Sequence, residues 1–470
     1  MFLRSTGWLW TATICQALVH ALHGQTAGPS TVPSPSPSSM QPVSGPEEWK
    51  VEGPSPEQQS GSEQMPETGP GAPFEQEPGW SSGELNSSLP ENSTQFQLPP
   101  DQLPVDPRAT GLKFSVGPID IRPLMQFTVE YSDNILDSTS NQRRDLIYII
   151  SPGLTLAAGD YMAKQYHYLT LTYVPTLNLY NHYSSLNSLD QHLRIDGQYG
   201  LERLKLSGYF GYDKAFGGNR DIGGLVNSDY YTMGGAAKYL INQQFSLEAL
   251  GDQVFAHYQN ANGSKTFINH DWLNYNFTPK LTVSAGSAFG FLQPDKGGTQ
   301  TYEQGLGRLQ FASTDKLTFD GNAGFEVRQF PSGIGMRVTP VFGLSATYQL
   351  FPGTTLGVSG ARIVTYSASV TGSNYTATNI SASITQHLVG NLYIGLDAGF
   401  ENDAYFHVSG AQPGTTERQD NYVILRPNLT YRWNDWANIS VSYLYRDNHS
   451  NSPGRSFYNN QIAVQMHVGF

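Results

Sequence analysis

The chain has 470 residues, of which only 14% are charged, yet its mean hydropathy is −0.38. Beyond the N-terminus no run of about 18 apolar residues occurs, which argues against a protein built from membrane-spanning helices. The formal net charge of −12 falls mostly on residues 25–108. The remainder is therefore close to neutral and lacks the basic surface typical of nucleic-acid binding.

Residues 1–24 are predicted to form a secretory signal peptide. Arg4 supplies the positive start, Trp8 to Leu22 is mostly apolar, and cleavage is expected near Ala21 or Gly24. Cys15 lies in this segment and is the only cysteine, so the mature chain would carry no thiol or disulfide. Lipidation of Cys15 is disfavoured, because Ile14 stands where such sites have a small residue.

Residues 25–110 are predicted to be a disordered arm rich in Pro, Ser and Glu. The Ser-Pro repeat from Pro33 to Pro37 typifies it, and its apolar content is too small to offset chain entropy. We expect a periplasmic tether or spacer. Two alternatives remain open: an arm that binds the cell wall or another periplasmic partner, and an arm that folds into the lumen of the domain that follows.

From residue 111 to residue 470 the polarity alternates with a period of two in segments of about ten to fourteen residues. In Ile119–Tyr131, for example, Ile121, Phe127 and Val129 alternate with polar side chains. Eighteen such strands are predicted, at 119–131, 145–158, 165–180, 190–200, 203–214, 229–241, 245–258, 266–277, 281–292, 300–312, 317–330, 337–350, 354–366, 374–388, 392–401, 421–433, 437–446 and 458–470.

The connections between these strands alternate in length. Very short ones, such as 200–202 and 352–354, alternate with others that are often longer, such as 133–143, 216–227, 402–420 and 447–457. Short turns on one side and larger loops on the other are typical of outer-membrane barrels, in which the sheet must close to pair every backbone group. The predicted fold is an all-β, antiparallel, up-and-down transmembrane barrel of sixteen to eighteen strands.

Three charged residues do not fit the alternation. Asp271 and Glu303 stand on the apolar side of their strands. Arg362 also falls on the apolar side, just after Gly360, and a β-bulge there is expected to turn it into the lumen.

A barrel of sixteen to eighteen strands normally leaves an aqueous channel. In the simpler interpretation of the polar inner face, the charges pair across the wall and keep the lumen solvated, with no specific binding of solutes. In the more specific interpretation, the inner face is an ion or sugar filter in which Tyr168, Tyr180 and Tyr393 stack on sugar rings. The candidate lumen-lining residues are Asp120, Arg122, Glu130, Arg194, Asp196, Lys205, Lys238, Arg308, Asp320, Arg328, Asp397, Arg426 and Arg432.

The last segment, 460–470, resembles the C-terminal signature of bacterial outer-membrane barrels, which the barrel assembly machinery reads. Its apolar positions are Ile462, Val464, Met466, Val468 and Phe470. The alternation predicts that Gln465 and His467 face the lumen, that Val464, Met466 and Phe470 face lipid, and that this strand pairs with the one near Ile119.

Motifs of catalysis and cofactor binding are absent from the sequence. It has no Cys-x-x-Cys or His-x-x-x-His metal spacing, no Gly-x-Ser-x-Gly and no Walker loop. Ser383 and His387 share one side of a strand, but that side is predicted to face the lumen and not the membrane rim. We therefore expect no cofactor, no metal and no enzymatic activity.

Two short motifs carry a resemblance to a known family. Glu130-Tyr131-Ser132-Asp133-Asn134-Ile135 and Ile150-Ser151-Pro152-Gly153-Leu154-Thr155-Leu156 are similar to segments of the outer-membrane β-barrel porins that are associated with exopolysaccharide operons. The resemblance implies an outer-membrane channel and points to polysaccharide export. The Pro-rich arm does not belong to this pattern, which puts any shared partner in doubt.

The predicted function is a pore in the outer membrane of a Gram-negative-type bacterium that passes hydrophilic solutes, with saccharide or exopolysaccharide export as its finer form. The alternatives are a structural anchor or surface-binding barrel and, less favoured, a barrel-borne lipid or ester hydrolase. The expected partners are outer-membrane lipid and lipopolysaccharide, the barrel assembly machinery, saccharides, and a periplasmic partner of the arm, with no nucleic acid.

Overall fold

The computed structural model describes residues 114–161, 166–314, 316–331, 335–369, 373–407 and 417–469. The predicted signal peptide, the predicted arm and Phe470 lie outside these residues, so what the sequence predicts for them stays a prediction. Among the described residues, no helix combines the length and the apolar character needed to cross a membrane.

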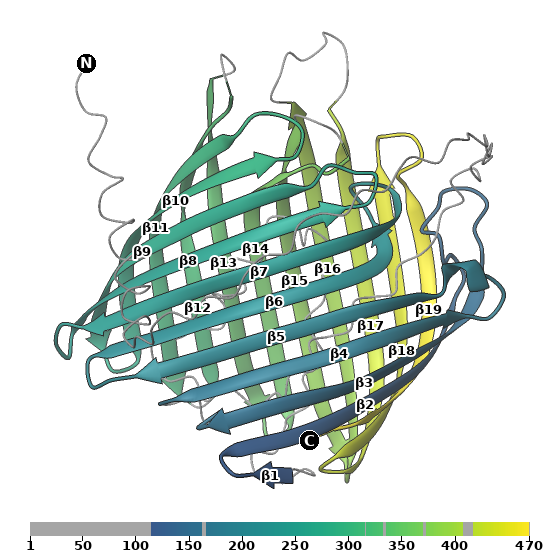
Figure 1. Ribbon diagram of the computed structural model, residues 1–470, viewed down its shortest axis with the longest axis horizontal. Helices are drawn as coiled ribbons and strands as arrows, with labels where there is room; N and C mark the ends of the chain where they lie inside the picture. Colours follow the sequence, from purple (N-terminus) through teal and green to yellow (C-terminus); the bar gives the residue numbers. More distant parts are fainter. Residues whose placement is uncertain are drawn as a thin grey trace, which may run out of the picture. The chain divides into compact units, whose positions relative to one another are not determined.

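The described residues form one closed antiparallel sheet in which each strand pairs with its neighbours in sequence (Figure 1). All eighteen predicted strands are present. They are β2 (Ile119–Ser132), β3 (Asp145–Gly159), β4 (Tyr168–Tyr180), β5 (Ser188–Gly200), β6 (Leu204–Asn219), β7 (Gly224–Leu240), β8 (Phe245–Tyr258), β9 (Ser264–Thr278), β10 (Leu281–Pro294), β11 (Gln300–Thr314), β12 (Leu317–Gln329), β13 (Met336–Phe351), β14 (Thr354–Tyr366), β15 (Ser373–Val389), β16 (Leu392–His407), β17 (Gln419–Asn434), β18 (Ala437–Ser450) and β19 (Phe457–Val468).

Two small elements add to the predicted strands. The short strand β1 (Phe114–Val116) forms a hairpin with the start of β2, and the 3-10 helix η1 (Ser184–Leu186) lies between β4 and β5. The barrel closes where β19 pairs with β2, from Gln461 opposite Ser132 to Val468 opposite Met125. The predicted closing pair is therefore confirmed. The barrel strands β2–β19 are eighteen, an even number, so β2 starts and β19 ends at the same end of the barrel. We call this the terminal end and the opposite end the loop end.

The alternation of the sequence separates two faces of the wall. In β19 the side chains of Ile462, Val464 and Met466 are exposed, whereas Gln461 is buried on the opposite side. Across the barrel the exposed side is apolar, over an area far beyond what soluble monomers show, as expected for a lipid-facing wall. Several exposed aromatic side chains lie next to the short turns, where they fit a membrane–water interface: Tyr199, Tyr239, Phe277, Phe351, Tyr431 and Trp433.

Several predicted long loops are partly strand. The expected loop 216–227 is a tight turn at 220–223, because β6 and β7 stay paired up to Asn219 and Gly224. Likewise β16 continues to His407 and β18 to Ser450. Polar residues in these stretches suggested loops, but they belong to strand ends that extend the wall at the loop end.

The prediction of a β-bulge at Gly360 is wrong. The ladder between β13 and β14 shows no shift there, and it stops instead at Phe342 opposite Arg362. Beyond this point Met336–Val341 pairs only with β12, and Ile363–Tyr366 pairs only with β15. The loop-end parts of β14, β15 and β16 thus leave β13 together. We call this three-stranded segment (363–369, 373–379 and 402–407) the flap, and the gap beside it the seam.

The lipid-facing assignment gives a stability prediction for β19. Replacing Val464, which lies mid-strand on the apolar face, with Arg should destabilise the barrel by roughly 2–4 kcal/mol. Replacing the adjacent Gln465, which points to the other face, should change stability little. Urea unfolding in lipid vesicles, followed by the gel mobility of the folded barrel, compares the two variants; equal losses would contradict the assignment of the faces.

Candidate functional site

The thirteen candidate lumen residues all lie on the side of their strands opposite the exposed apolar side chains. Contacts between strands that are not neighbours identify this side as the interior, because such side chains meet only across the lumen. Gln300 of β11, for example, donates to Asn374 of β15 at 3.1 Å. Whether these residues line a path for solutes stays a prediction.

Near the terminal end, the inner charges are held by neighbouring polar groups. Asp120 accepts hydrogen bonds from Tyr161 Oη at 2.7 Å and Ser115 Oγ at 2.5 Å. Arg122 lies 5.7 Å from the ring centre of Tyr161. Glu130, at the loop end of the same strand, is buried. The carboxylate of Asp120 is therefore fixed in place rather than left as a freely moving charge in the lumen.

Other candidates form pairs along the wall. Arg194 donates to Asp196 at 3.1 Å, and Arg426 donates to Asp397 at 3.2 Å. Asp320 accepts from Gln310 at 2.8 Å. Three more candidates sit at defined positions in the ladder: Lys205 directly opposite Lys238, and Arg432 opposite Asn438.

Arg308 and Arg328 are the most deeply buried of the candidates. Arg308 donates to Glu248 at 3.0 Å and to Asn274 at 2.7 Å, with its guanidinium 4.3 Å from the ring centre of Trp272. Arg328 donates to Glu326 at 2.7 Å and lies 4.5 Å from the ring centre of Tyr302. Buried guanidinium groups that have a carboxylate and an aromatic partner stabilise the packing of the barrel wall rather than attract ions.

At the loop end, the tip of the β6–β7 hairpin reaches across the lumen to the opposite wall. Arg220 forms an ion pair with Glu401 of β16 and lies 4.0 Å from the ring centre of Tyr422 on β17. Eight strands lie between β7 and β16 in either direction around the sheet. The contact therefore spans the barrel interior, and the turn 219–223 acts as a plug tip.

Asp221 fastens this tip to the flap. Its carboxylate accepts hydrogen bonds from the Ser367 hydroxyl at 2.9 Å, the Ala368 amide at 2.6 Å and the Tyr405 hydroxyl at 3.0 Å. Ser369 donates to it through both its amide, at 3.2 Å, and its hydroxyl, at 2.9 Å. A buried carboxylate surrounded by five donors is strongly held, because each bond to a charged acceptor is stronger than a neutral one.

Arg418, which directly precedes β17, also holds the plug tip in place. Its guanidinium donates to the backbone carbonyls of Arg220 and Asp221, both at 3.0 Å, and to Asp420. It also lies 4.2 Å from the ring centre of Tyr405. The turn itself is stabilised by Asn219, whose side-chain oxygen accepts from the Ile222 amide at 3.0 Å.

The opposite face of the flap packs against β11–β13. Phe406 and Val364 form a buried cluster with Phe330, and the Arg337 guanidinium lies 3.8 Å from the ring centre of Phe406. The flap is therefore enclosed on both faces, by the plug tip on one side and by the inner side of β11–β13 on the other. Together, plug tip and flap occupy part of the lumen at the loop end.

The β2–β3 connection contributes a buried carboxyl near the plug tip. Asp137 accepts from Arg446 at 3.0 Å and from Asn459 at 2.8 Å. Burial raises the pKa of the Asp137 carboxyl, and the charges of Arg446 and Arg220 act in the opposite direction.

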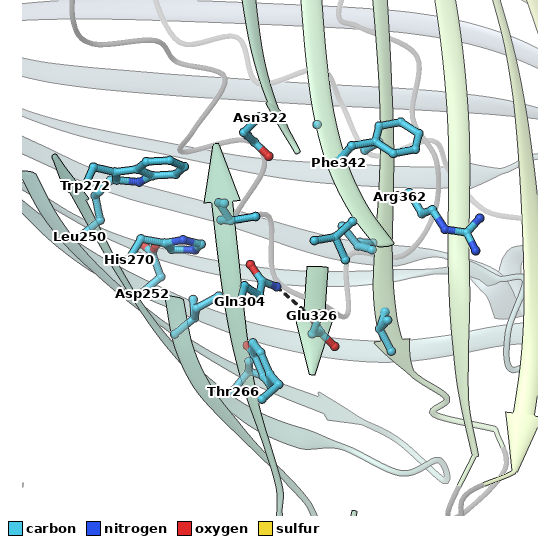
Figure 2. Close-up of a pocket in the computed structure, with 18 of the residues that line it drawn as sticks. Leu250, Asp252, Thr266, His270, Trp272, Gln304, Asn322, Glu326, Phe342 and Arg362 are labelled. Atoms are coloured by element: carbon cyan, nitrogen blue, oxygen red, sulfur yellow. Dashed lines mark hydrogen bonds between the residues drawn. The ribbon is translucent and has the colours of Figure 1, made fainter. Parts of the chain in front are cut away.

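Below the flap lies a cavity of about 110 Å³ inside the barrel (Figure 2). Its lining comes from β8, β9 and β11–β14 and includes Trp272, His270, Gln304 and Glu326. Gln304 donates to Glu326 at 2.9 Å, which is the dashed contact in Figure 2. Among the described residues, no cluster of three or more His, Asp or Glu side chains is arranged to hold a metal ion.

The plug residues were not among the candidates drawn from the sequence. Arg220, Asp221 and Arg418 stand in stretches that were predicted as loops, and nothing local shows that one loop contacts another nine strands away. The one local signal is the run of charged residues in a tight turn, Arg220-Asp221 before Gly223-Gly224.

The family comparison agrees with the barrel. Residues 293–470, which include β11 to β19, match the family described as "Putative beta-barrel porin 2". This match confirms the predicted resemblance to a β-barrel porin family and the predicted location in the outer membrane of a Gram-negative bacterium. Porins are channels rather than enzymes, in agreement with the expectation of no catalysis. No curated protein matches the sequence.

The structural comparison finds solved structures that align with this chain over nearly their whole length. OccAB3 of Acinetobacter baumannii aligns at 10% identity over 76% of this chain and 100% of its own, with a TM-score of 0.42. OpdK of Pseudomonas aeruginosa aligns at 11% identity over 75% and 99%, with a TM-score of 0.40. OpdO of the same organism aligns at 10% identity over 76% and 98%, with a TM-score of 0.43. The fold assignment rests on the strand pairing itself.

Proposed function

We propose that this outer-membrane barrel is a channel for hydrophilic solutes that rests in a closed state. The observation that carries the proposal is the set of contacts at the loop end through which Asp221 and Arg220 of the plug tip bind the flap and β16 across the lumen. A purely structural barrel has no need of an interior obstruction that is held by exchangeable polar contacts. An obstruction of this kind makes sense where passage has to be limited.

Saccharides are the finer part of the proposal, and exopolysaccharide export is one form of it. The support is limited to inner aromatic groups that are able to stack on sugar rings. Tyr393 stacks on His387 near the terminal end, with ring centres 4.7 Å apart. Tyr180, in contrast, is buried in a cluster with Ile135 and Ile147, which removes it from the set of sugar-stacking candidates.

Planar-bilayer conductance of the purified full chain tests the channel. We expect small or infrequent steps from the native protein, larger steps when the plug is unfastened, and partial block by saccharides at the lumen. A folded barrel that never conducts, with or without the plug contacts, would favour the alternative of a surface anchor. Conductance that is indifferent to all sugars would leave a general channel and remove the saccharide part.

A further inference from the structure

The seam between β13 and β14 is a break in an otherwise continuous wall. Six residues of β13, Met336–Val341, have no partner strand on the β14 side. Pro340 lies in this stretch, and proline is found at strand edges because it has no N–H to pair. Across the seam, the Val364 carbonyl accepts a hydrogen bond from Arg328 Nη2 at 3.2 Å instead of from a strand.

The seam lies at the level of the lipid-facing belt. The outward side chains beside it are apolar and exposed: 73% for Met336, 59% for Val338 and 62% for Phe325. Val338 and Val327 pair directly, as do Phe325 and Pro340. An apolar exterior at this level is expected in contact with acyl chains and not with water.

The cavity below the flap extends to both sides of the seam. It is lined by Val341 and Gly343 of β13 and by Ala361, Ile363 and Val364 of β14. Leu250, Val254, Ile268 and Trp272 line its far wall. This part of the cavity, next to a gap in the wall, is lined by apolar side chains, whereas Asp252, Gln304 and Glu326 line its polar part.

Two arginines flank the seam. Arg337 lies over Phe406, and Arg362 donates to Thr378 at 2.8 Å. The Nε of Arg362 is buried and has no hydrogen-bond partner in the part of the chain that the structure describes. Among the described residues, neither forms an ion pair with a carboxylate. Figure 2 shows Arg362 pointing away from the other labelled residues of the cavity, as its place on the lipid-facing side of β14 requires. Arg362 is half-buried and keeps an unpaired donor, and Arg337 is exposed, so both guanidinium groups are available to an anionic group.

We propose that the seam is a lateral opening and that the cavity takes the apolar body of a single-chain amphiphile whose anionic head is held by Arg362 and Arg337. The cavity has room for one compact apolar group rather than for the several chains of a bilayer lipid. This route runs sideways into the membrane, and it goes beyond the proposed passage of hydrophilic solutes along the lumen.

Trp272, which lines the cavity, reports on occupation. In a full-length variant in which Trp272 is the only tryptophan, a bromine-labelled fatty acid should quench its fluorescence saturably. Replacing Arg337 and Arg362 together with Gln should weaken this binding about tenfold and leave binding of the matching bromine-labelled alcohol unchanged. Equal loss for acid and alcohol would overturn the role of the two arginines. Equal quenching by a brominated phospholipid would replace the single-chain amphiphile with a bilayer lipid.

Two glycine variants supply a matched control. Gly343→Phe fills the cavity at the seam, where the three atoms nearest to the added carbon all belong to the flexible Asn322 side chain, and should abolish the quenching. Gly305→Phe adds the same ring on the outer face of β11, where nothing lies within 4 Å, and should leave the quenching intact. Ion conductance of both variants reports separately on folding and on the proposed channel. Undiminished quenching in a folded Gly343→Phe barrel would overturn the cavity assignment.

Cysteine cross-linking tests the opening itself. Gly343 and Ala361 are partners in the ladder, so Val341 and Ile363 would be the next pair of the same type if the wall closed. We expect a Gly343→Cys/Ala361→Cys pair to oxidise to completion and a Val341→Cys/Ile363→Cys pair to remain mostly reduced. Equal cross-linking of the two pairs would show a continuous wall and overturn the lateral opening.

Discussion

Replacing Asp221 with Ala is expected to convert rare, small conductance steps into frequent steps that are several-fold larger. The Asp221 carboxylate accepts from Ser367, Ala368, Ser369, Tyr405 and Arg418. Without it these donors lose their acceptor inside the barrel, and each unpaired buried group costs on the order of 1–3 kcal/mol. The plug tip should then leave the flap, because only the backbone contacts of Arg418 and the ion pair of Arg220 with Glu401 still hold it.

The neighbouring Asp229 provides the control for this experiment. It lies on the same hairpin, but it accepts a hydrogen bond from Tyr212 at 3.0 Å and contacts neither the flap nor Arg418. Asp229→Ala should therefore keep the native conductance. A folded Asp221→Ala barrel with the native step size would mean that the plug tip does not obstruct the path of ions, and the closed-channel proposal would have to be abandoned.

The wall of the barrel could be predicted from the sequence because the positions of its side chains depend on neighbouring residues of the same strand. Side chains of a strand alternate between the two faces, so the lipid-facing residues of β2 or β19 can be read along the chain. Turn residues mark where the strands end at the short turns of the terminal end, and an even strand number follows from having both ends of the barrel sheet on one side. The same alternation places Asp120, Arg308 and Arg426 on the inner face without any knowledge of the closed sheet.

The obstruction inside the barrel is not local, and for that reason the sequence did not predict it. Asp221 and Ser367 are separated by 146 positions, and their contact depends on how far the β14–β16 wall bends inward. Arg362 illustrates the same point. Its place on the apolar side suggested a bulge, but the anomaly marks the position where β14 parts from β13. The charge of Arg362 on the apolar side correctly indicated an irregularity in the strand. Only the three-dimensional arrangement shows that this irregularity is the separation of β14 from β13.

Replacing Arg308 with Met is expected to destabilise the barrel by roughly 3–5 kcal/mol, because it leaves the Glu248 carboxylate buried without its cation. The two side chains are 1% and 3% exposed, so water cannot take the place of the lost partner. Asn274 also loses one of its hydrogen bonds, the one that its oxygen accepts from Arg308 at 2.7 Å. Urea unfolding in lipid vesicles measures the loss.

The double variant Arg308→Met/Glu248→Met separates a specific ion pair from a general loss of packing. If the loss in Arg308→Met comes from an uncompensated carboxylate, removing Glu248 as well should recover most of it, because two apolar side chains of similar length can fill the same space. If the losses of the two single variants simply add, the pair is not coupled and the guanidinium braces the wall mainly through its contact with Trp272. Recovery would show that this inner charge serves the wall and not the solute.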